Sequence, residues 1–224
     1  MIEFTIEEND IELKYYDLDT TLTELAEALE SYRISTEAAG LKTNGCKGCG
    51  ECCSDNIPVL GFDIPRLLDG LDIGFDEASK TVLTLPEKPD MAFRRKAIKE
   101  MARSASITEL EATLLFEYNN AETVIMAKKA NMQCCFLNNN LCSGYTIRPY
   151  SCGLYLCNMG QRLSYIQEMI IRQGTWHAYS RLGWISEADI AHNPFLAADS
   201  YEKLLLSSFE FQLENTLEQL FFYF

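Results

Sequence analysis

The sequence predicts an α+β fold that is mostly helical, with helices surrounding a small, irregular or β-structured core rich in cysteine. Apolar residues recur at spacings of three and four over long stretches, as on the buried face of a helix. All nine cysteines lie in two short stretches, residues 46–53 and 134–157. No internal repeat or low-complexity linker divides the chain, so we expect residues 1–224 to form a single domain. Its cysteine-cluster core would cover about 44–157, and its helical C-terminal part about 161–224.

Composition and charge exclude several classes of protein. Apolar residues make up 47% of the chain and charged residues 23%, as in an ordinary globular protein. The formal net charge is −14, and no basic footprint is available to displace counterions from phosphates. We therefore expect no nucleic acid partner, and the same charge argues against an anionic membrane surface.

The N-terminus shows no pattern of a targeting segment. Residues 1–5 contain no basic region followed by an apolar run, so we expect no signal peptide. No stretch approaches the roughly 18 consecutive apolar residues that cross a bilayer, so we expect no membrane span. A cytoplasmic location is the resulting expectation. In such a reducing compartment, clustered cysteines are typical of metal or redox chemistry, and an odd total fits poorly with complete disulfide pairing.

Two elements are predicted before the first cysteine group. Residues 1–18 alternate loosely between apolar and acidic side chains, which indicates a short β-hairpin. Thr21 followed by Glu24 has the form of a capping box, in which each side chain bonds the other residue's amide. Apolar residues at helical spacing follow, so we expect a helix over about 22–32.

Between the two cysteine groups the pattern is mainly helical. Asp63 is expected to cap a short helix, and Ser106 with Glu109 predicts a second capped start. The expected elements are an extended piece at 57–60, the short helix at 63–68, an irregular connection at 75–90 after a brief helical turn, and helices at about 91–103 and 107–118.

Around the second cysteine group, short extended pieces lead into helix. Residues 123–132 show a weak strand pattern. Residues 136–141 predict a tight turn between two extended pieces, because Asn tolerates left-handed backbone conformations. From about 161 to the end, apolar residues such as Leu204 and Phe209 recur at spacings of three and four, which predicts helix.

The spacing of the first cysteine group suits a metal site. Cys46, Cys49 and Cys52 are separated by two-residue gaps, and Gly48 and Gly50 relieve the backbone so that its amides can bond sulfur. Such a loop suits a zinc knuckle and equally suits three corners of an iron–sulfur cluster. Crowded thiolates repel one another unless a cation neutralises them. We therefore expect the two groups to meet in space, at one site or at two adjacent sites.

The adjacent pair Cys52 and Cys53 interrupts the ferredoxin-type run. Adjacent side chains tend to diverge, so one of the pair would complete the first site, and the other would reach a second site or remain a free thiol. Two rival interpretations are buried thiols that behave as small hydrophobic residues and a redox dithiol relay. Nine clustered cysteines argue against the first, and the missing strand-before, helix-after context argues against the second.

Three motifs together carry a resemblance to a known family. They are CKGCGECC at residues 46–53, CCFL at 134–137, and RPYSC at 148–152, which is followed by Cys157. This arrangement resembles the YkgJ-type cysteine-cluster family, whose members are described as zinc- or iron-chelating domains. A related cysteine region occurs in flagellin lysine N-methylases. The resemblance covers about residues 44–157 and implies metal binding without an assigned reaction.

By this resemblance, eight cysteines are candidate metal ligands. Cys135 is the odd one out, because it occupies a position that is often proline in the family. Two glycines depart from the family pattern: Gly144 replaces a branched apolar residue, and Gly153 replaces an arginine that would bring positive charge near the thiolates. The eight carried-over ligands are Cys46, Cys49, Cys52, Cys53, Cys134, Cys142, Cys152 and Cys157.

Arg148 is a candidate cofactor-binding residue, placed beside the metal centre. A divalent ion held by four thiolates carries a net charge of about −2, so a nearby guanidinium would stabilise it and donate hydrogen bonds to sulfur. The equally weighted alternative is a surface arginine in front of a helix that starts at Pro149. His177 and His192 could also be ligands, although isolated histidines among helices are more often packed or solvated.

The sequence therefore favours a metal-binding protein that holds an iron–sulfur cluster, for example 4Fe–4S, or zinc. No serine–histidine–acid set, phosphate-binding glycine loop or zinc-protease helix is present, so no reaction is assigned. One alternative is a redox or methyl-transfer enzyme that uses the cluster. Another is a structural zinc-bearing interaction module, whose aromatic C-terminus binds a protein partner or a second copy to form a homo-oligomer. Those aromatic residues are Phe209, Phe211, Phe221, Phe222, Tyr223 and Phe224.

Overall fold

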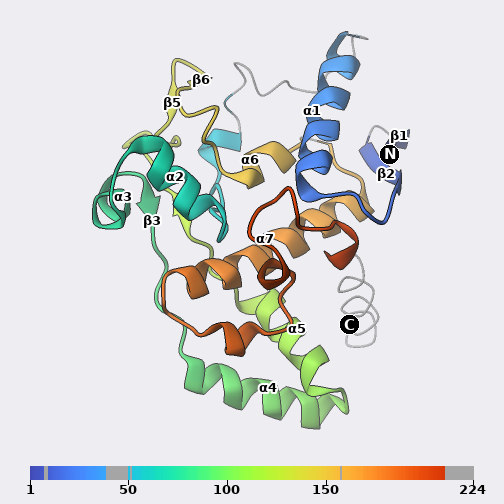
Figure 1. Ribbon diagram of the computed structural model, residues 1–224, viewed down its shortest axis with the longest axis vertical. Helices are drawn as coiled ribbons and strands as arrows, with labels where there is room; N and C mark the ends of the chain where they lie inside the picture. The colour runs from blue at the N-terminus through green and yellow to red at the C-terminus, as the bar shows by residue number, and fades with distance from the viewer. Residues whose placement is uncertain (8–9, 39–49, 51, 157, 210–224) are drawn as a thin grey trace.

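The computed structural model describes residues 1–7, 10–38, 50, 52–156 and 158–209 (Figure 1). In chain order, the elements are β1 Ile2–Glu7, β2 Asp10–Tyr16, α1 Leu22–Ala38, the 3-10 turn Cys52–Ser54, α2 Asp63–Leu71, α3 Phe75–Thr81, β3 Leu83–Thr84, α4 Met91–Ala105, α5 Glu109–Asn120, β4 Ile125–Met126, β5 Leu137–Asn138, β6 Leu141–Cys142, α6 Tyr150–Leu154, α7 Gln161–Arg181, and the 3-10 turns Glu187–Ile190 and Pro194–Ala197.

Helices dominate this arrangement, and short antiparallel strand pairs accompany them, which confirms the predicted α+β, mostly helical class. α7 runs through the middle of the molecule (Figure 1). β5, β6 and α6 lie on one side of it along the longest axis, and α4 and α5 lie at the opposite end (Figure 1). None of the described helices is both long enough and apolar enough to cross a bilayer.

The N-terminal elements form as predicted. β1 pairs with β2 in an antiparallel hairpin. The Thr21 amide donates to the Glu24 carboxylate at 2.8 Å, and the Glu24 amide donates to the Thr21 hydroxyl at 3.3 Å, which confirms the capping box. α1 continues to Ala38, past the predicted end at 32, because no glycine or proline interrupts the chain before Gly40.

Two predicted caps are wrong. α2 begins at Asp63 itself, and the Asp63 carboxylate accepts hydrogen bonds from amides outside the helix instead of capping it. α5 is capped by Thr108 and Glu111, because Ser106 adopts a left-handed φ of 56° where α4 ends and is not available for the next helix. Within the connection predicted to be irregular after a brief helical turn, α3 and β3 form, and the remainder has no regular element.

Some of the predicted extended pieces form strands, and others form only short or single pairings. Asn139 and Asn140 have φ values of 48° and 60° and form the predicted tight turn between β5 and β6. By contrast, β4 covers only two of the residues predicted as strand in 123–132. The extended piece predicted at 57–60 pairs through a single bridge, from Pro58 to Ile125.

The C-terminal part is helical over α7 and again at residues 207–209, where the described chain ends, with 3-10 turns and loops between them. α7 begins where helix was predicted, but residues 198–206 are not helical. Leu204 is nevertheless buried, so a looped segment, rather than a helix, packs it on the core. Phe209 is also buried, and it lies in the helical residues 207–209. The predicted helix and the aromatic residues beyond 209 lie outside the described residues.

α7 organises the interior. It contributes Ile166, Ala178 and Trp176, respectively, to three buried apolar clusters of the described chain. The segment before α2 crosses α7 at close range, because the Gly61 amide donates to the Gly174 carbonyl at 3.1 Å. A Cβ on Gly174 would lie 2.9 Å from the Leu60 Cβ, so glycine is required for this approach. The backbone just before α2 is therefore fixed directly on the central helix.

Candidate metal centre

Backbone contacts bring the two cysteine groups together. The Cys134 amide donates to the Cys53 carbonyl at 2.7 Å. Beside it, the Lys128 ammonium donates to the Ser54 carbonyl at 2.7 Å, and Lys128 also forms a β-bridge with Cys134. The 3-10 turn of the first group and the start of the second group are therefore neighbours, although 81 positions separate Cys53 from Cys134 in the sequence.

The β5–β6 hairpin adds Cys142 to this region. Cys142 pairs with Leu137 across the hairpin, and Leu137 packs in the same apolar cluster as Cys53 and Cys134. Gly50 has a left-handed φ of 74°, and a Cβ at this position would meet Leu137 Cδ2 at 3.3 Å. Gly50 therefore lies against the hairpin of the second group.

Cys152 is brought to the same cluster by α6, which is attached to the segment before α2. The Tyr150 amide donates to the Asp63 carboxylate at 2.9 Å, and the Ser151 hydroxyl donates to the Pro58 carbonyl at 2.6 Å. Asp63 is fully buried, and it also accepts a bond from the Leu60 amide at 3.0 Å. Burial raises the pKa of the Asp63 carboxyl, while Arg66 and these amides oppose the shift. The RPYSC motif is thus positioned by a buried carboxylate.

The described cysteines influence one another's charge. A hydrogen bond from Cys52 lowers the pKa of Cys53, although burial and the nearby Cys134, Cys142 and Cys152 act to raise it. Burial raises the pKa of Cys152 well above its usual range, and Arg148 opposes the shift. Thiols that disfavour one another's ionisation cannot all become thiolates without a compensating positive charge.

The vicinal pair in the second group is strongly polarised. A hydrogen bond from the Cys135 thiol, together with the Phe136 and Leu137 amides and the Lys129 ammonium, lowers the pKa of Cys134 to about 6. The same bond and burial raise the pKa of Cys135. The Cys135 sulfur also lies 4.0 Å from the Val82 carbonyl oxygen, as a weak donor. Lys129 and the neighbouring amides favour an ionised Cys134, whereas Cys135 has the Val82 carbonyl as an acceptor.

The donor chemistry fits a thiophilic metal. All six described cysteines are free thiols: Cys52, Cys53, Cys134, Cys135, Cys142 and Cys152. Thiolate sulfur is the ligand that zinc and iron–sulfur clusters prefer. Within the part of the chain that the structure describes, no three Cys, His, Asp or Glu side chains form a metal site by themselves. The predicted ligands Cys46, Cys49 and Cys157 lie outside the described residues, so the ligand set stays a prediction.

Arg148 belongs to a polar cluster beside these cysteines. Its guanidinium lies 4.1 Å from the centre of the Tyr145 ring and 3.7 Å from the Glu30 carboxylate. The Tyr145 hydroxyl donates to Glu30 at 3.0 Å, and Arg33 donates to the same carboxylate at 2.7 Å. Arg148 acts to lower the pKa of both Cys142 and Cys152. Sequence reasoning missed Glu30, because no motif distinguishes it from the other acidic residues of α1.

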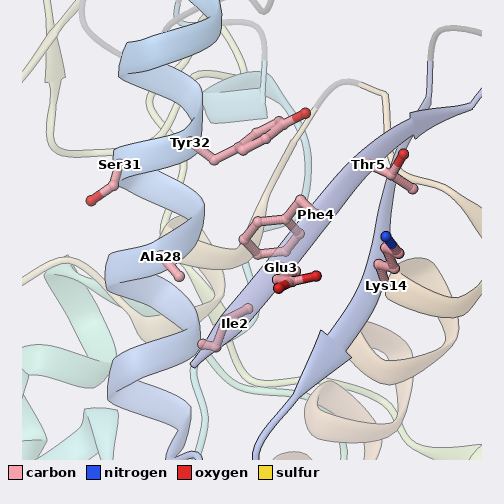
Figure 2. A pocket seen from close by; sticks show the side chains of 8 residues that line it. All are labelled: Ile2, Glu3, Phe4, Thr5, Lys14, Ala28, Ser31 and Tyr32. Carbon is pink, nitrogen blue, oxygen red and sulfur yellow. The ribbon is translucent and has the colours of Figure 1, made fainter.

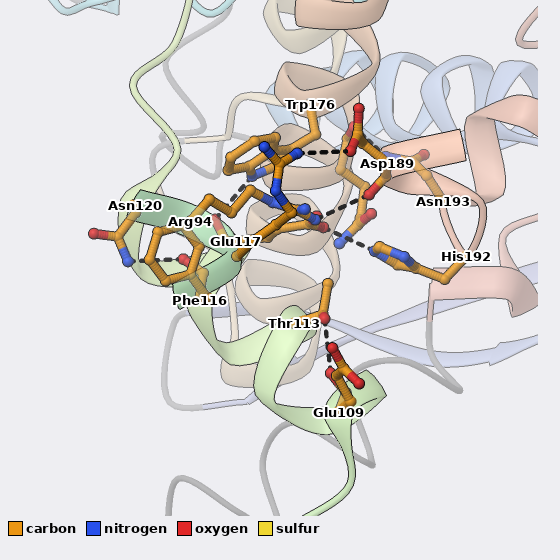
Figure 3. Close-up of polar contacts among 12 residues, drawn as sticks. Arg94, Glu109, Thr113, Phe116, Glu117, Asn120, Trp176, Asp189, His192 and Asn193 are labelled. Carbon is orange, nitrogen blue, oxygen red and sulfur yellow. Dashed lines mark hydrogen bonds and ion pairs between the residues drawn. The ribbon is translucent and has the colours of Figure 1, made fainter. Parts of the chain in front are cut away.

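Both histidines have other contacts. His177 packs on the Phe62 ring at 4.8 Å, and burial lowers the pKa of His177 to about 4. His192 Nε2 lies 2.9 Å from the carboxylate of the fully buried Glu117, which also pairs with Arg94 (Figure 3). No sequence motif predicts this second polar cluster, because Arg94, Glu117 and His192 are far apart along the chain.

A separate groove lies between the N-terminal hairpin and α1. It has a volume of about 560 Å³ and is lined by Phe4 and Tyr32, whose ring centres are 5.2 Å apart (Figure 2). None of its lining residues is a cysteine or histidine. The groove is therefore not part of the candidate metal centre.

The joined groups of free cysteines are the feature expected of a cysteine-cluster protein. A family model described as "CxxCxxCC: Putative zinc- or iron-chelating domain" matches residues 45–170. This match spans more than half of the chain, and the protein belongs to that family. The family description indicates chelation of zinc or iron. No curated protein and no solved structure matches the chain.

The attachment of α6 can be tested at Asp63. Asp63→Asn replaces one acceptor oxygen with a donor group that faces backbone amides in a buried site. We expect the free energy of unfolding, measured by urea titration, to fall by about 2 kcal/mol. Asp69→Asn is the matched control, because Asp69 is exposed on the same helix. Equal stability of the two variants would contradict the role assigned to Asp63.

Proposed function

We propose that cysteines of both groups hold one metal centre, which is an iron–sulfur cluster or a zinc ion. The observation that carries this proposal is the 2.7 Å hydrogen bond from the Cys134 amide to the Cys53 carbonyl. Such a contact fixes the two sulfur-bearing segments relative to each other through main-chain atoms rather than through sulfur. A preformed arrangement lowers the conformational entropy lost when the ligands close around an ion.

Electrostatics supports a cation in this place. Several partly buried thiols lie within each other's field, and each ionised sulfur disfavours ionisation of the next. Nearby cationic side chains are Lys129, which favours ionised Cys134, and Arg148, which favours ionised Cys142 and Cys152. Two single charges cannot offset a complete set of thiolates. A divalent ion or an iron–sulfur core would supply the missing positive charge.

The proposed ligands are drawn from the eight cysteines of the family pattern. Among them, Cys53, Cys134, Cys142 and Cys152 affect one another's pKa values and are the strongest candidates within the described residues. Cys135 is proposed to stay outside the ligand set, because its thiol donates toward Cys134 and the Val82 carbonyl. Zinc closed by four sulfurs would be structural, whereas an iron–sulfur cluster would carry electrons.

The proposal is tested by metal content after anaerobic purification of the full chain. We expect bound iron with visible charge-transfer absorption, or bound zinc without colour. Cys134→Ser and Cys152→Ser should each lose most of the metal, because each removes a sulfur ligand. Cys135→Ser is the matched control and should keep it. The proposal is wrong if the wild-type chain holds neither metal, or if all three variants keep equal amounts.

Arg148 is proposed to stabilise the charge of the centre. Arg148→Gln removes the positive charge next to Cys142 and Cys152, so we expect metal affinity to fall by about tenfold or more. Arg148→Lys should recover part of the loss, because it restores charge without the guanidinium geometry. Competition with a chromophoric chelator measures the affinity. Arg181→Gln is the control, since Arg181 is exposed and lies at the end of α7. Affinities of Arg148→Gln and Arg181→Gln within twofold of each other would exclude this role.

A further inference from the structure

α4 concentrates positive charge in an otherwise acidic chain. This helix holds five of the 19 Lys and Arg residues and a single acidic residue, Glu100. The rest of the chain therefore carries a net charge of −18, compared with −14 for the whole. α4 lies at the end of the molecule opposite β5, β6 and α6 (Figure 1). Positive charge is thus gathered far from the candidate metal centre.

Helical geometry places four of these cations on one face. The fifth, Arg94, points inward, where it pairs with the buried Glu117 and lies 5.1 Å from the centre of the Trp176 ring (Figure 3). At 3.6 residues per turn, the other four lie within an arc of about 100°, which they share only with Ala92. We call this arc the basic face of α4; it consists of Arg95, Lys96, Lys99 and Arg103.

The basic face is exposed and only weakly neutralised. Arg95 lies 3.7 Å from Asp189, and Lys96 lies 3.8 Å from Glu100, which are long distances for exposed ion pairs. Lys99 and Arg103 are exposed and form no ion pair with any residue that the structure describes. Their charges are available to carboxylates from outside the chain.

A groove lined by both polar and apolar side chains adjoins the basic face. It has a volume of about 390 Å³ and lies between α4, α5 and residues 188–192. Its apolar lining includes Ile98 and Leu110, and the Leu110 side chain is 53% exposed. Arg95 belongs both to the groove lining and to the basic face. The acidic lining residues Glu109 and Asp189 disfavour a carboxylate beside them, and the exposed Leu110 side chain offers a contact to an apolar group.

We propose that the basic face and the groove together bind an acidic, amphipathic segment of a partner protein. An apolar side chain of the segment enters the groove, and its carboxylates lie along Lys99 and Arg103. Charge complementarity favours this occupant over other polyanions. A nucleic acid needs a broader basic footprint, and its phosphates gain nothing from the exposed Leu110 side chain. A flat anionic membrane would also approach the strongly acidic remainder of the chain. A single protein segment is narrow enough to contact α4 alone.

The test measures binding of the full chain to a fluorescein-labelled peptide of repeating Glu-Leu-Glu-Glu units by fluorescence anisotropy at low salt. We expect Lys99→Glu with Arg103→Glu to weaken binding by at least about tenfold, because attraction becomes repulsion. Lys80→Glu with Lys88→Glu is the matched control: it changes the net charge equally at exposed positions outside α4, and binding should stay within twofold. Circular dichroism verifies that both double variants are folded.

Further measurements distinguish an amphipathic protein segment from other anionic partners. Leu110→Asp should weaken peptide binding, whereas labelled poly-glutamate, which lacks apolar groups, should bind less tightly than the Glu-Leu peptide. The proposal is overturned if the wild-type chain does not bind the peptide, or if the two double variants lose binding equally. It is also overturned if oligo-deoxythymidine or phosphatidylserine vesicles bind as tightly as the peptide does.

Discussion

Mutual repulsion among crowded thiolates is the constraint on which the account of this structure depends. Cys53, Cys134, Cys142 and Cys152 come from a 3-10 turn, a loop, a hairpin and a short helix, yet each lies within the electrostatic influence of others. A fold that gathers such groups must either keep them protonated or supply positive charge. One or two buried free thiols can behave as small hydrophobic residues, but six in this part of the chain are too many for that role alone. The chain also belongs to a family described as zinc- or iron-chelating.

The rest of the described chain fixes these cysteines from the outside. The backbone segment before α2 is bound to α7 by the hydrogen bond from the Gly61 amide to the Gly174 carbonyl. That segment holds α6 through the Pro58 carbonyl, and Asp63, the first residue of α2, holds it through the Tyr150 amide. On the other side, Glu30 of α1 joins Arg33, Tyr145 and Arg148. The positions of the sulfurs are therefore set by buried polar contacts and glycine packing rather than by the cysteine loops alone.

Local signals in the sequence predicted part of this arrangement. The Thr21–Glu24 capping box and the turn at Asn139 and Asn140 were predictable, because both depend on neighbouring residues. The cap predicted at Asp63 was wrong, since its carboxylate serves an amide 87 positions away. Glu30 could not be identified, because an acidic residue in a helix becomes informative only when its distant partners are known. The helix predicted over residues 198–206 was wrong. Apolar residues of a loop that packs on the core can show the same spacing as those of a helix.

The most direct measurement is X-ray absorption at the edge of whichever metal the anaerobically purified full chain retains. A centre held by cysteines of both groups predicts a first shell of sulfur neighbours at about 2.3 Å, with Cys134→Ser reducing that shell. For iron, a further iron neighbour would identify a cluster rather than a single ion. A first shell made only of nitrogen and oxygen at about 2.0–2.2 Å would contradict the account, because the cysteines would then not be the ligands.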